Sequence, residues 1–364
     1  MKILFHLGHP AHFHLFKNTF TRLKEEGVNP IILIKKKDIL EELLEKSGFE
    51  YLNILPNGRR NGKIGVMFGL LKQDIKLWRI TRKHRPKLLV GSSLAITHVG
   101  KLLNIPSIHF GEDDAELVPQ YVKVAFPFAT HLVAPDVCSV GKYQAKKVAY
   151  SSYQKLAYLH PGNFTPSREI AGKYVSVDEK YFILRTVKLN AYHDDNKKGL
   201  NSYVIQKLID MLSPYGKVYI TSEIPLKPEL ERYRIKINPI DIHHVMAFAS
   251  VYIGDSQSMA VESGVLGVPF IRFNDFIGRI SVLNEIENHY KLGFGIKSDD
   301  PEKLFATTKQ LIEMENCREE FQARKEIMLS EKIDLTKLIT AILLNYPQTI
   351  ESLKKDPKYQ FRFK

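Results

Sequence analysis

One segment, residues 251–273, limits the possible folds of this chain more than any other. Its sequence, VYIGDSQSMAVESGVLGVPFIRF, predicts a buried strand ending at Gly254, a tight turn, a helix from about Ser258 and a second apolar strand. Ser256 or Ser258 can cap the helix, and Gly267 tolerates the positive φ that often ends one. Free backbone N–H groups and the positive end of the helix dipole then lie at the end of a strand, where a phosphate group can bind.

The helix of this segment also carries a carboxylate, Glu262. It lies one turn, ~6 Å, beyond Ser258, where it can accept hydrogen bonds from both hydroxyls of a ribose. The alternative is a connector helix with one solvated glutamate. Neither a Walker-type loop nor a GxGxxG motif after the first strand is present. The predicted nucleotide-binding site comprises Asp255, Ser256, Gln257, Ser258, Met259 and Glu262.

Short apolar runs alternate with helical segments twice along the chain, before and after a turn-rich stretch at residues 150–178. Continuous apolar strands of this kind are typical of parallel sheets covered on both faces. We therefore expect an α/β protein with two doubly wound Rossmann-like domains facing across a cleft, over residues 1–160 and 161–334. A C-terminal helix and a basic tail follow over residues 335–364. We expect this segment to pack back on the first domain, with a mobile tail from residue 354.

Composition narrows the class of partner. The formal net charge of +13 over 364 residues favours anionic ligands. Nucleic acid is not expected, because no RNP-type aromatic motif, helix-turn-helix signature or zinc finger is visible. Cys138 and Cys317 lie far apart without metal-ligand spacing, which disfavours disulfides and structural zinc. The opening MKILFHLGHP predicts a strand, not a signal peptide, and no apolar run approaches the ~20 residues of a membrane span. We expect a cytoplasmic protein.

A long helix predicted at about residues 64–82 allows two interpretations. Its sequence VMFGLLKQDIKLWRI is apolar over much of its surface and is followed by the basic RKHRP. It is either an ordinary helix covered on both sides or a patch that makes peripheral contact with a membrane.

Polar side chains are expected beyond the carboxyl ends of the strands, where ligands bind in such sheets. His12 can act as a general base or phosphate donor because imidazole titrates near neutral pH, although a helix-start polar residue is the alternative. Repulsion among the acids of residues 112–114 would raise a pKa and suit one to proton transfer, unless they form a solvated loop. The spacing of the histidines is too loose to predict a metal site. The first domain contributes Gly8, His9, His12, His14, Ser92, Ser93, Glu112 and Asp113.

Arg185 ends a buried strand of the second domain. A guanidinium at that position matches the geometry of a diphosphate, which it can bind with two parallel hydrogen bonds. A structural salt bridge is the alternative.

With these motifs the chain resembles the GT-B superfamily of nucleotide-sugar enzymes, and more specifically the prokaryotic family catalogued as domain of unknown function 354. The resemblance spans about residues 1–330. It rests on the opening LGHPAHFHLF, on Leu184-Arg185 with Ala191-Tyr192, and on GDSQSMAVESGVLGVP at residues 254–269.

Within the superfamily, the non-hydrolysing UDP-N-acetylglucosamine 2-epimerase is similar over this last stretch. Asp255 and Ser256 keep its pattern, Glu262 matches its ribose-binding glutamate, and Gln257 and Ser258 replace two glycines. The chain also departs from the epimerase. FILRTVKL stands where the epimerase has His-Arg-Arg-Glu-Asn, and Gly91-Ser92-Ser93 replaces Gly-Asp-Thr, which removes a catalytic carboxylate.

The resemblance implies a metal-independent glycosyltransferase without a further cofactor. It would move a sugar from a nucleotide donor, expected to be UDP-linked, to a glycan or lipid-linked acceptor in surface-polysaccharide or glycolipid synthesis. The second domain would hold the donor and the first the acceptor, with His12, Glu112 or Asp113 as the base. The alternatives are an epimerase or hydrolase acting on the nucleotide sugar, and a non-catalytic nucleotide-sugar-binding protein.

Overall fold

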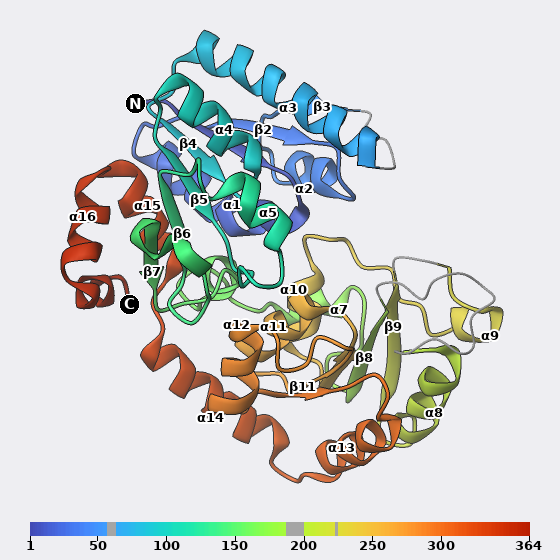
Figure 1. Cartoon of the computed structure of the whole chain (residues 1–364). Helices are drawn as coiled ribbons and strands as arrows, with labels where there is room; N and C mark the ends of the chain where they lie inside the picture. The colour runs from blue at the N-terminus through green and yellow to red at the C-terminus, as the bar shows by residue number, and fades with distance from the viewer. Residues whose placement is uncertain (57–62, 187–199, 223–224) are drawn as a thin grey trace. The chain divides into compact units, whose positions relative to one another are not determined.

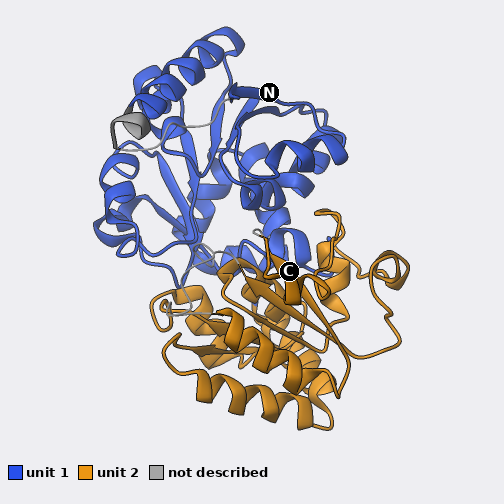
Figure 2. Cartoon of the chain, turned by 90° about the vertical axis from the view of Figure 1, so that its right-hand side faces the viewer, with its two compact units in different colours: residues 1–163, 332–364 blue, residues 164–331 orange. Residues whose placement is uncertain are grey.

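The chain divides into two compact units (Figure 2). Unit 1 contains residues 1–163 and 332–364, and unit 2 contains residues 164–331. A computed structural model describes residues 1–56, 63–186, 200–222 and 225–364, with side chains from residue 68 onward in the second of these ranges. The motif residues Ala191 and Tyr192 lie outside the described residues.

Unit 1 is built on a parallel sheet with the strand order β3-β2-β1-β4-β5-β6-β7 (Figure 1). The order reverses between β1 and β4, and ligands of doubly wound sheets bind at such a reversal. The strands are β1 (Ile3–Leu7), β2 (Ile31–Lys35), β3 (Leu52–Leu55), β4 (Leu88–Gly91), β5 (Ser107–Phe110), β6 (His131–Pro135) and β7 (Lys147–Tyr150).

The helices of unit 1 follow the predicted periodicity. In α1, the apolar side chains at helical spacing are all buried, as expected: Phe13, Phe16, Phe20 and Leu23. The helical segments are α1 (Pro10–Glu25), α2 (Leu40–Lys46), α3 (Lys63–His84), α4 (Leu94–Leu103), α5 (Pro119–Ala125), the 3-10 helix η1 (Gly141–Lys146), α6 (Leu156–Leu159), α15 (Leu335–Leu344), α16 (Gln348–Lys355) and the 3-10 helix η3 (Pro357–Phe363).

Unit 2 is a second parallel sheet with the order β9-β8-β10-β11-β12, so its reversal lies between β8 and β10. Its strands are β8 (Tyr181–Thr186), β9 (Lys217–Ser222), β10 (Val251–Gly254), β11 (Phe270–Phe273) and β12 (Gly293–Ile296). Its helical segments are α7 (Arg168–Gly172), α8 (Ser202–Leu212), α9 (Pro228–Glu231), α10 (Ile242–Ala247), α11 (Gln257–Val265), α12 (Ser281–Asn284), the π-helix η2 (Glu285–His289), α13 (Pro301–Glu313) and α14 (Cys317–Glu331). Two parallel Rossmann-like sheets confirm the predicted fold class.

Two local features of unit 2 are not evident in the sequence pattern. Ile220 and Arg234 form an isolated parallel bridge outside the named strands. The helix α14 was not predicted, because its charged sequence CREEFQARKEIMLSE has a weak apolar stripe and buries only Phe321 and Met328.

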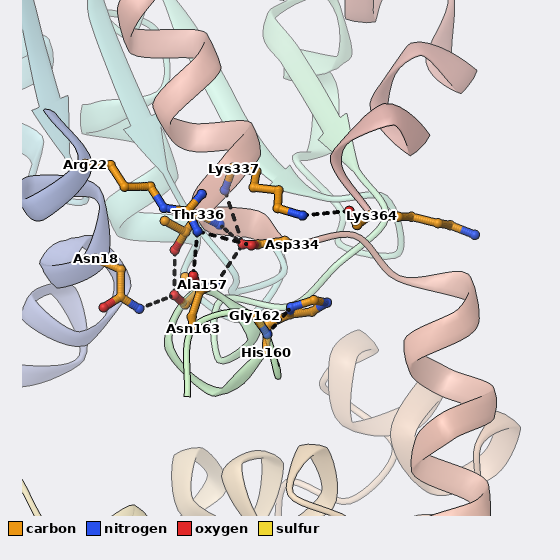
Figure 3. Close-up of polar contacts among 10 residues, drawn as sticks. All are labelled: Asn18, Arg22, Ala157, His160, Gly162, Asn163, Asp334, Thr336, Lys337 and Lys364. Carbon is orange, nitrogen blue, oxygen red and sulfur yellow. Dashed lines mark hydrogen bonds and ion pairs between the residues drawn. The ribbon is translucent and has the colours of Figure 1, made fainter. Parts of the chain in front are cut away.

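The segment after residue 331 returns to unit 1, where Asp334 fastens it (Figure 3). The Asp334 carboxylate accepts hydrogen bonds from the Thr336 and Lys337 backbone N–H groups at 2.9 and 3.2 Å, and from Asn163 Nδ2 at 2.8 Å. Arg22 Nη2 lies 3.5 Å from its other oxygen and donates to Asn163 Oδ1 at 2.8 Å. The two points where the chain leaves and re-enters unit 1 are thereby joined.

The tail after residue 354 is ordered, so its expected mobility was wrong. Gln360 is buried, and its side-chain oxygen accepts from the Ser151 backbone N–H at 2.5 Å. The backbone oxygens of Phe363 and Lys364 accept from Asp334 N–H and Lys337 Nζ. A basic composition predicts solvent exposure, but contacts from residues 209 positions away in sequence hold the tail in place.

Candidate functional site

Four residues at the carboxyl end of the unit 2 sheet lie side by side on adjacent strands. In the strand register, Arg185 of β8 pairs with Thr221 of β9 and with Gly254 of β10, and Gly254 pairs with Arg272 of β11. Side chains at paired positions of parallel strands point to the same face. Two guanidinium side chains, Arg185 and Arg272, therefore flank the last residue of β10, where the sheet order reverses.

The helix α11 begins directly after this row. Ser256 is its N-cap, and the Ser256 hydroxyl accepts from the Met259 backbone N–H at 3.4 Å. Gln257 and Ser258 form the first turn, which contains no acidic residue. Of the two predicted caps the structure selects Ser256, so the remaining N–H groups of the first turn and the helix dipole form a site that favours an anion.

Gly254 is required by the packing around it. A Cβ at this position would lie 2.4 Å from the Tyr252 hydroxyl and 2.9 Å from Arg185 Cβ. Burial raises the pKa of Tyr252 well above its ordinary value, so its hydroxyl stays protonated. Tyr252 could not be predicted as part of this site, because a tyrosine inside an apolar strand carries no sequence signal that distinguishes it from a core residue.

Glu262 is buried and not solvated, so the alternative of a connector helix with an exposed glutamate is wrong. Its exposed fraction is 7% and that of His243, on α10, is 3%. His243 Nε2 lies 3.4 Å from Glu262 Oε1. This contact places the buried Glu262 carboxylate beside α10.

A buried ion pair supports the turn before α11. Arg272 Nε donates to Glu287 Oε1 at 2.9 Å, and Arg272 Nη1 donates to Asn274 Oδ1 at 3.2 Å. Asn274 Nδ2 in turn donates to the carbonyl oxygen of Asp255 at 3.2 Å. Desolvation lowers the pKa of Arg272 and raises that of Glu287, and their attraction opposes both shifts. This series of hydrogen bonds links the Asp255 turn to the buried Arg272–Glu287 ion pair. The folding of unit 2 brings these residues together.

In unit 1, the turn after β1 holds its own histidines. His9 is the N-cap of α1, and His9 Nδ1 accepts from the Ala11 N–H at 3.2 Å. The Gly8 backbone N–H donates to His12 Nδ1 at 3.1 Å. A neutral imidazole that accepts at Nδ1 carries its proton on Nε2.

The surroundings of His12 keep it neutral. Desolvation by the surrounding protein lowers the pKa of His12 to about 3. Repulsion of the protonated ring contributes to this shift, and it comes from His9, His6, His109 and Lys35. A ring with its proton on Nε2 and its Nδ1 already bonded donates a hydrogen bond and cannot accept a proton at Nε2. His12 is thus suited to donate to a substrate oxygen, and less suited to serve as the base.

His14 is not brought together with His9 and His12. Its ring packs against Phe13 at 5.6 Å and against Tyr158 of α6 at 5.1 Å between centroids. Two positions along a helix differ by about 200° in direction, so His12 and His14 face opposite ways.

The serines after β4 contact a buried histidine and a tyrosine. Ser93 Oγ lies 2.5 Å from His6 Nδ1, and the Ser92 carbonyl accepts from the Tyr121 hydroxyl at 3.0 Å. The Tyr121 hydroxyl also lies 2.7 Å from His109 Nε2. Burial lowers the pKa of His109 to about 4. Ser92 and Ser93 therefore lie directly after β4, which pairs with β1 up to His6 and Gly91 at the reversal of the strand order.

The acidic run after β5 separates into different roles. Glu112 accepts from the Gln154 N–H at 2.7 Å and forms an ion pair with Lys155 at 2.5 Å, so both its oxygens are engaged within unit 1. Asp114 is buried and accepts from the Ser139 N–H at 2.8 Å. Asp113 retains an exposed side chain. Desolvation of its carboxylate by the surrounding protein and repulsion from Glu112 raise its pKa. Among these three acids, Asp113 is the one whose geometry suits proton transfer.

Neither a metal centre nor a membrane span emerges from the described ranges. No group of three or more His, Cys, Asp or Glu side chains there is arranged to hold a metal ion. No helix in the same ranges combines the length and apolar character needed to cross a membrane.

Two parallel Rossmann-like sheets, with polar side chains gathered at the reversal of each strand order, define an α/β protein of the GT-B fold. The chain belongs to the family described as protein of unknown function (DUF354), whose model matches residues 1–346. A search of curated proteins by sequence gives no significant match.

Solved structures share the fold at low sequence identity. A UDP-GlcNAc 2-epimerase from Neisseria meningitidis bound to UDP-GlcNAc is 14% identical, with a TM-score of 0.67 over 94% of this chain and 100% of that one. A UDP-GlcNAc 2-epimerase from Methanocaldococcus jannaschii is 16% identical, with a TM-score of 0.63 over 90% and 99%. The spinosyn rhamnosyltransferase SpnG complexed with spinosyn aglycone is 13% identical, with a TM-score of 0.60 over 95% and 100%.

Proposed function

We propose that this protein is a glycosyltransferase of the GT-B type that transfers a sugar from a UDP-linked donor to a glycan or lipid-linked acceptor in surface-polysaccharide or glycolipid synthesis. The observation that carries the proposal is the strand-order reversal of unit 2. There Arg185 and the acid-free first turn of α11 adjoin the end of β10, and Glu262 lies one turn further along α11.

The donor would bind through these groups of unit 2. The diphosphate accepts hydrogen bonds from the first-turn N–H groups of α11 and from the Arg185 guanidinium. The Glu262 carboxylate accepts hydrogen bonds from the ribose hydroxyls. When the bond between the sugar C1 and the diphosphate oxygen breaks, the electron pair leaves with UDP, and Arg185 and the helix dipole stabilise the new charge.

Unit 1 would bind the acceptor through the turn at residues 8–12. His12 donates through Nε2–H to a sugar oxygen, and Asp113 takes the proton from the attacking hydroxyl as the new C1–O bond forms. The raised pKa of Asp113 makes it a better proton acceptor than an ordinary aspartate. Asp113 is therefore the proposed general base, and Glu112 keeps its ion pair with Lys155.

A second candidate function is a UDP-GlcNAc 2-epimerase-like reaction, epimerisation or hydrolysis of the nucleotide sugar. It is favoured by the fold likeness to several UDP-GlcNAc 2-epimerases. This reaction is disfavoured by Ser92 and Ser93, which replace the segment that carries a catalytic carboxylate in the similar epimerase. Turnover of a UDP-sugar without any acceptor distinguishes this reaction from transfer.

The test is a thermal-shift and NMR turnover screen of the full chain with UDP and a panel of UDP-sugars. We expect stabilisation by UDP and a UDP-sugar, and a loss of at least tenfold in UDP affinity in Glu262→Gln. The control Glu302→Gln changes an exposed glutamate in the first turn of α13 and should bind like wild type. Equal affinity of wild type and Glu262→Gln would refute the donor site. Binding with no turnover in the presence of any acceptor would favour a non-catalytic nucleotide-sugar-binding protein.

A further inference from the structure

The inner face of α3 belongs to the core of unit 1 (Figure 1). Leu77 is fully buried and packs with Trp78 and Ile80 against the apolar cluster beneath the helix. Asp74, the only acidic residue of α3, turns toward α4, where its carboxylate lies 2.9 Å from His98 Nδ1. The inner face of α3 is therefore packed against the rest of unit 1.

The opposite side of α3 exposes large apolar side chains in one stripe. Phe68 is 63% exposed, Leu71 is 56% exposed and Ile75 is 42% exposed. Their spacing of three and four residues places them on a single helix face. The interpretation of α3 as an ordinary helix covered on both sides therefore does not hold for this face.

Basic side chains continue the same face toward the end of the helix. At 100° per residue, Lys72, Arg79, Arg82 and Lys83 fall within about 60° of the Phe68 direction, and Lys76 lies at its margin. Four of these five are exposed, and Lys76 is half-buried. The Arg82 guanidinium stacks over the half-buried ring of Trp78 at 5.1 Å. The outer face of α3 thus combines apolar side chains at one end with cations at the other and carries no acid.

We propose that the outer face of α3, comprising Phe68, Leu71, Lys72, Ile75, Lys76, Arg79, Arg82 and Lys83, docks on the surface of an anionic lipid bilayer. A helix with an apolar stripe and a basic flank lies in the plane of the membrane interface. Its apolar side chains enter the boundary of the acyl chains, and its Lys and Arg side chains meet lipid phosphates. Charge complementarity selects a lipid surface, because it supplies apolar contact and dense negative charge together. The proposal does not rest on the reaction that the protein catalyses.

The test is co-sedimentation of the full chain with vesicles of pure phosphatidylcholine, or with about 30% phosphatidylglycerol added. Wild type should bind the anionic vesicles and not the neutral ones, and about 0.5 M salt should release it. Phe68→Ser/Leu71→Ser/Ile75→Ser should lower the partition coefficient at least tenfold. Lys72→Glu/Arg79→Glu/Lys83→Glu should do the same. All six side chains are exposed, so both variants should keep the fold, which circular dichroism checks.

Two matched controls change unit 2. Ile327→Ser removes an apolar side chain that is 57% exposed on α14. Lys173→Glu/Lys297→Glu/Lys309→Glu changes the net charge by the same amount as the charge variant of α3. Both controls should bind anionic vesicles like wild type.

Three results would overturn the proposal. Wild type fails to bind anionic vesicles, or the α3 variants bind them like wild type, or the charge control loses binding as fully as the α3 charge variant. Sedimentation of the protein without vesicles tests whether this face instead contacts a second copy of the chain. An oligomer in wild type that the serine variant dissociates, without a change in vesicle binding, would show that this face contacts a second copy of the chain.

Discussion

Replacing Asp334 by alanine should destabilise unit 1 more than the loss of an ordinary helix cap. The Asp334 side chain is fully buried and caps α15, and its carboxylate also joins Asn163 to the segment that re-enters unit 1. Loss of the cap costs about 1 kcal/mol. The half-buried Asn163 amide loses an acceptor, for about 1 kcal/mol. The Arg22 contact is long and Arg22 is 29% exposed, so it adds about 1 kcal/mol or less.

These contributions sum to about 2–3 kcal/mol of unfolding free energy. For a unit of this size each kcal/mol lowers Tm by about 2–4 °C, so Asp334→Ala should lower it by about 4–12 °C. Asp334→Asn keeps an oxygen for the Thr336 N–H and loses only the charge, so its effect should be smaller. Differential scanning calorimetry of the full chain measures the shift, and hydrogen exchange of the α15 amides locates it.

Asp300→Ala is the matched control. Asp300 caps α13 by accepting from the Lys303 N–H at 3.1 Å, and its side chain is exposed. Its loss should cost about 1 kcal/mol. If Asp334→Ala costs no more than Asp300→Ala, or if exchange in α15 is unchanged, the reasoning about the buried carboxylate is refuted.

Three further results are expected from chemical denaturation. Gly254→Ala should lower the free energy of unfolding by about 1–3 kcal/mol, because the added Cβ would overlap neighbouring atoms. Gly172→Ala should not lower it, because the space around that position is open. Equal effects of the two substitutions would contradict the packing argument. The pKa of His109 falls from 6.5 to about 4 on folding, so the unfolded chain binds the proton first and unit 1 loses up to about 3 kcal/mol between pH 6.5 and 4. His109→Gln should flatten that slope, and an unchanged slope would show that other groups cause it. Glu112→Gln should cost about 2–4 kcal/mol, because the ion pair with Lys155 is only about 10% exposed; a neutral effect would return Glu112 to the candidate bases.

Some of the polar network could be anticipated from the chain and some could not. Arg185 lies near the end of one apolar strand and residues 255–262 directly follow another, so their place at the carboxyl end of a sheet could be read from the sequence. Arg272 could not be assigned in the same way, since FIRF reads as an apolar strand with one polar exception. Its role depends on Glu287 and Asn274, which only the folded unit 2 brings to it.

The same limit applies to the contacts of Glu112 and His14 and to the ordered tail. Each of these residues is polar and lies where local pattern predicts either a site or solvent. Their partners, Lys155, Tyr158 and Ser151, are chosen by long-range packing that no local spacing encodes.

The sequence by itself determined the two runs of alternating strands and helices, the core face of α1 and the strand–turn–helix unit of residues 251–273. These features depend on periodicity and capping, which act over a few residues. Only the tertiary structure decided which strands are neighbours, which nitrogen of His12 is bonded, and which side of α3 stays uncovered. Those outcomes depend on contacts between residues far apart in the chain, because strand order and burial are properties of the packed sheet and not of any one segment.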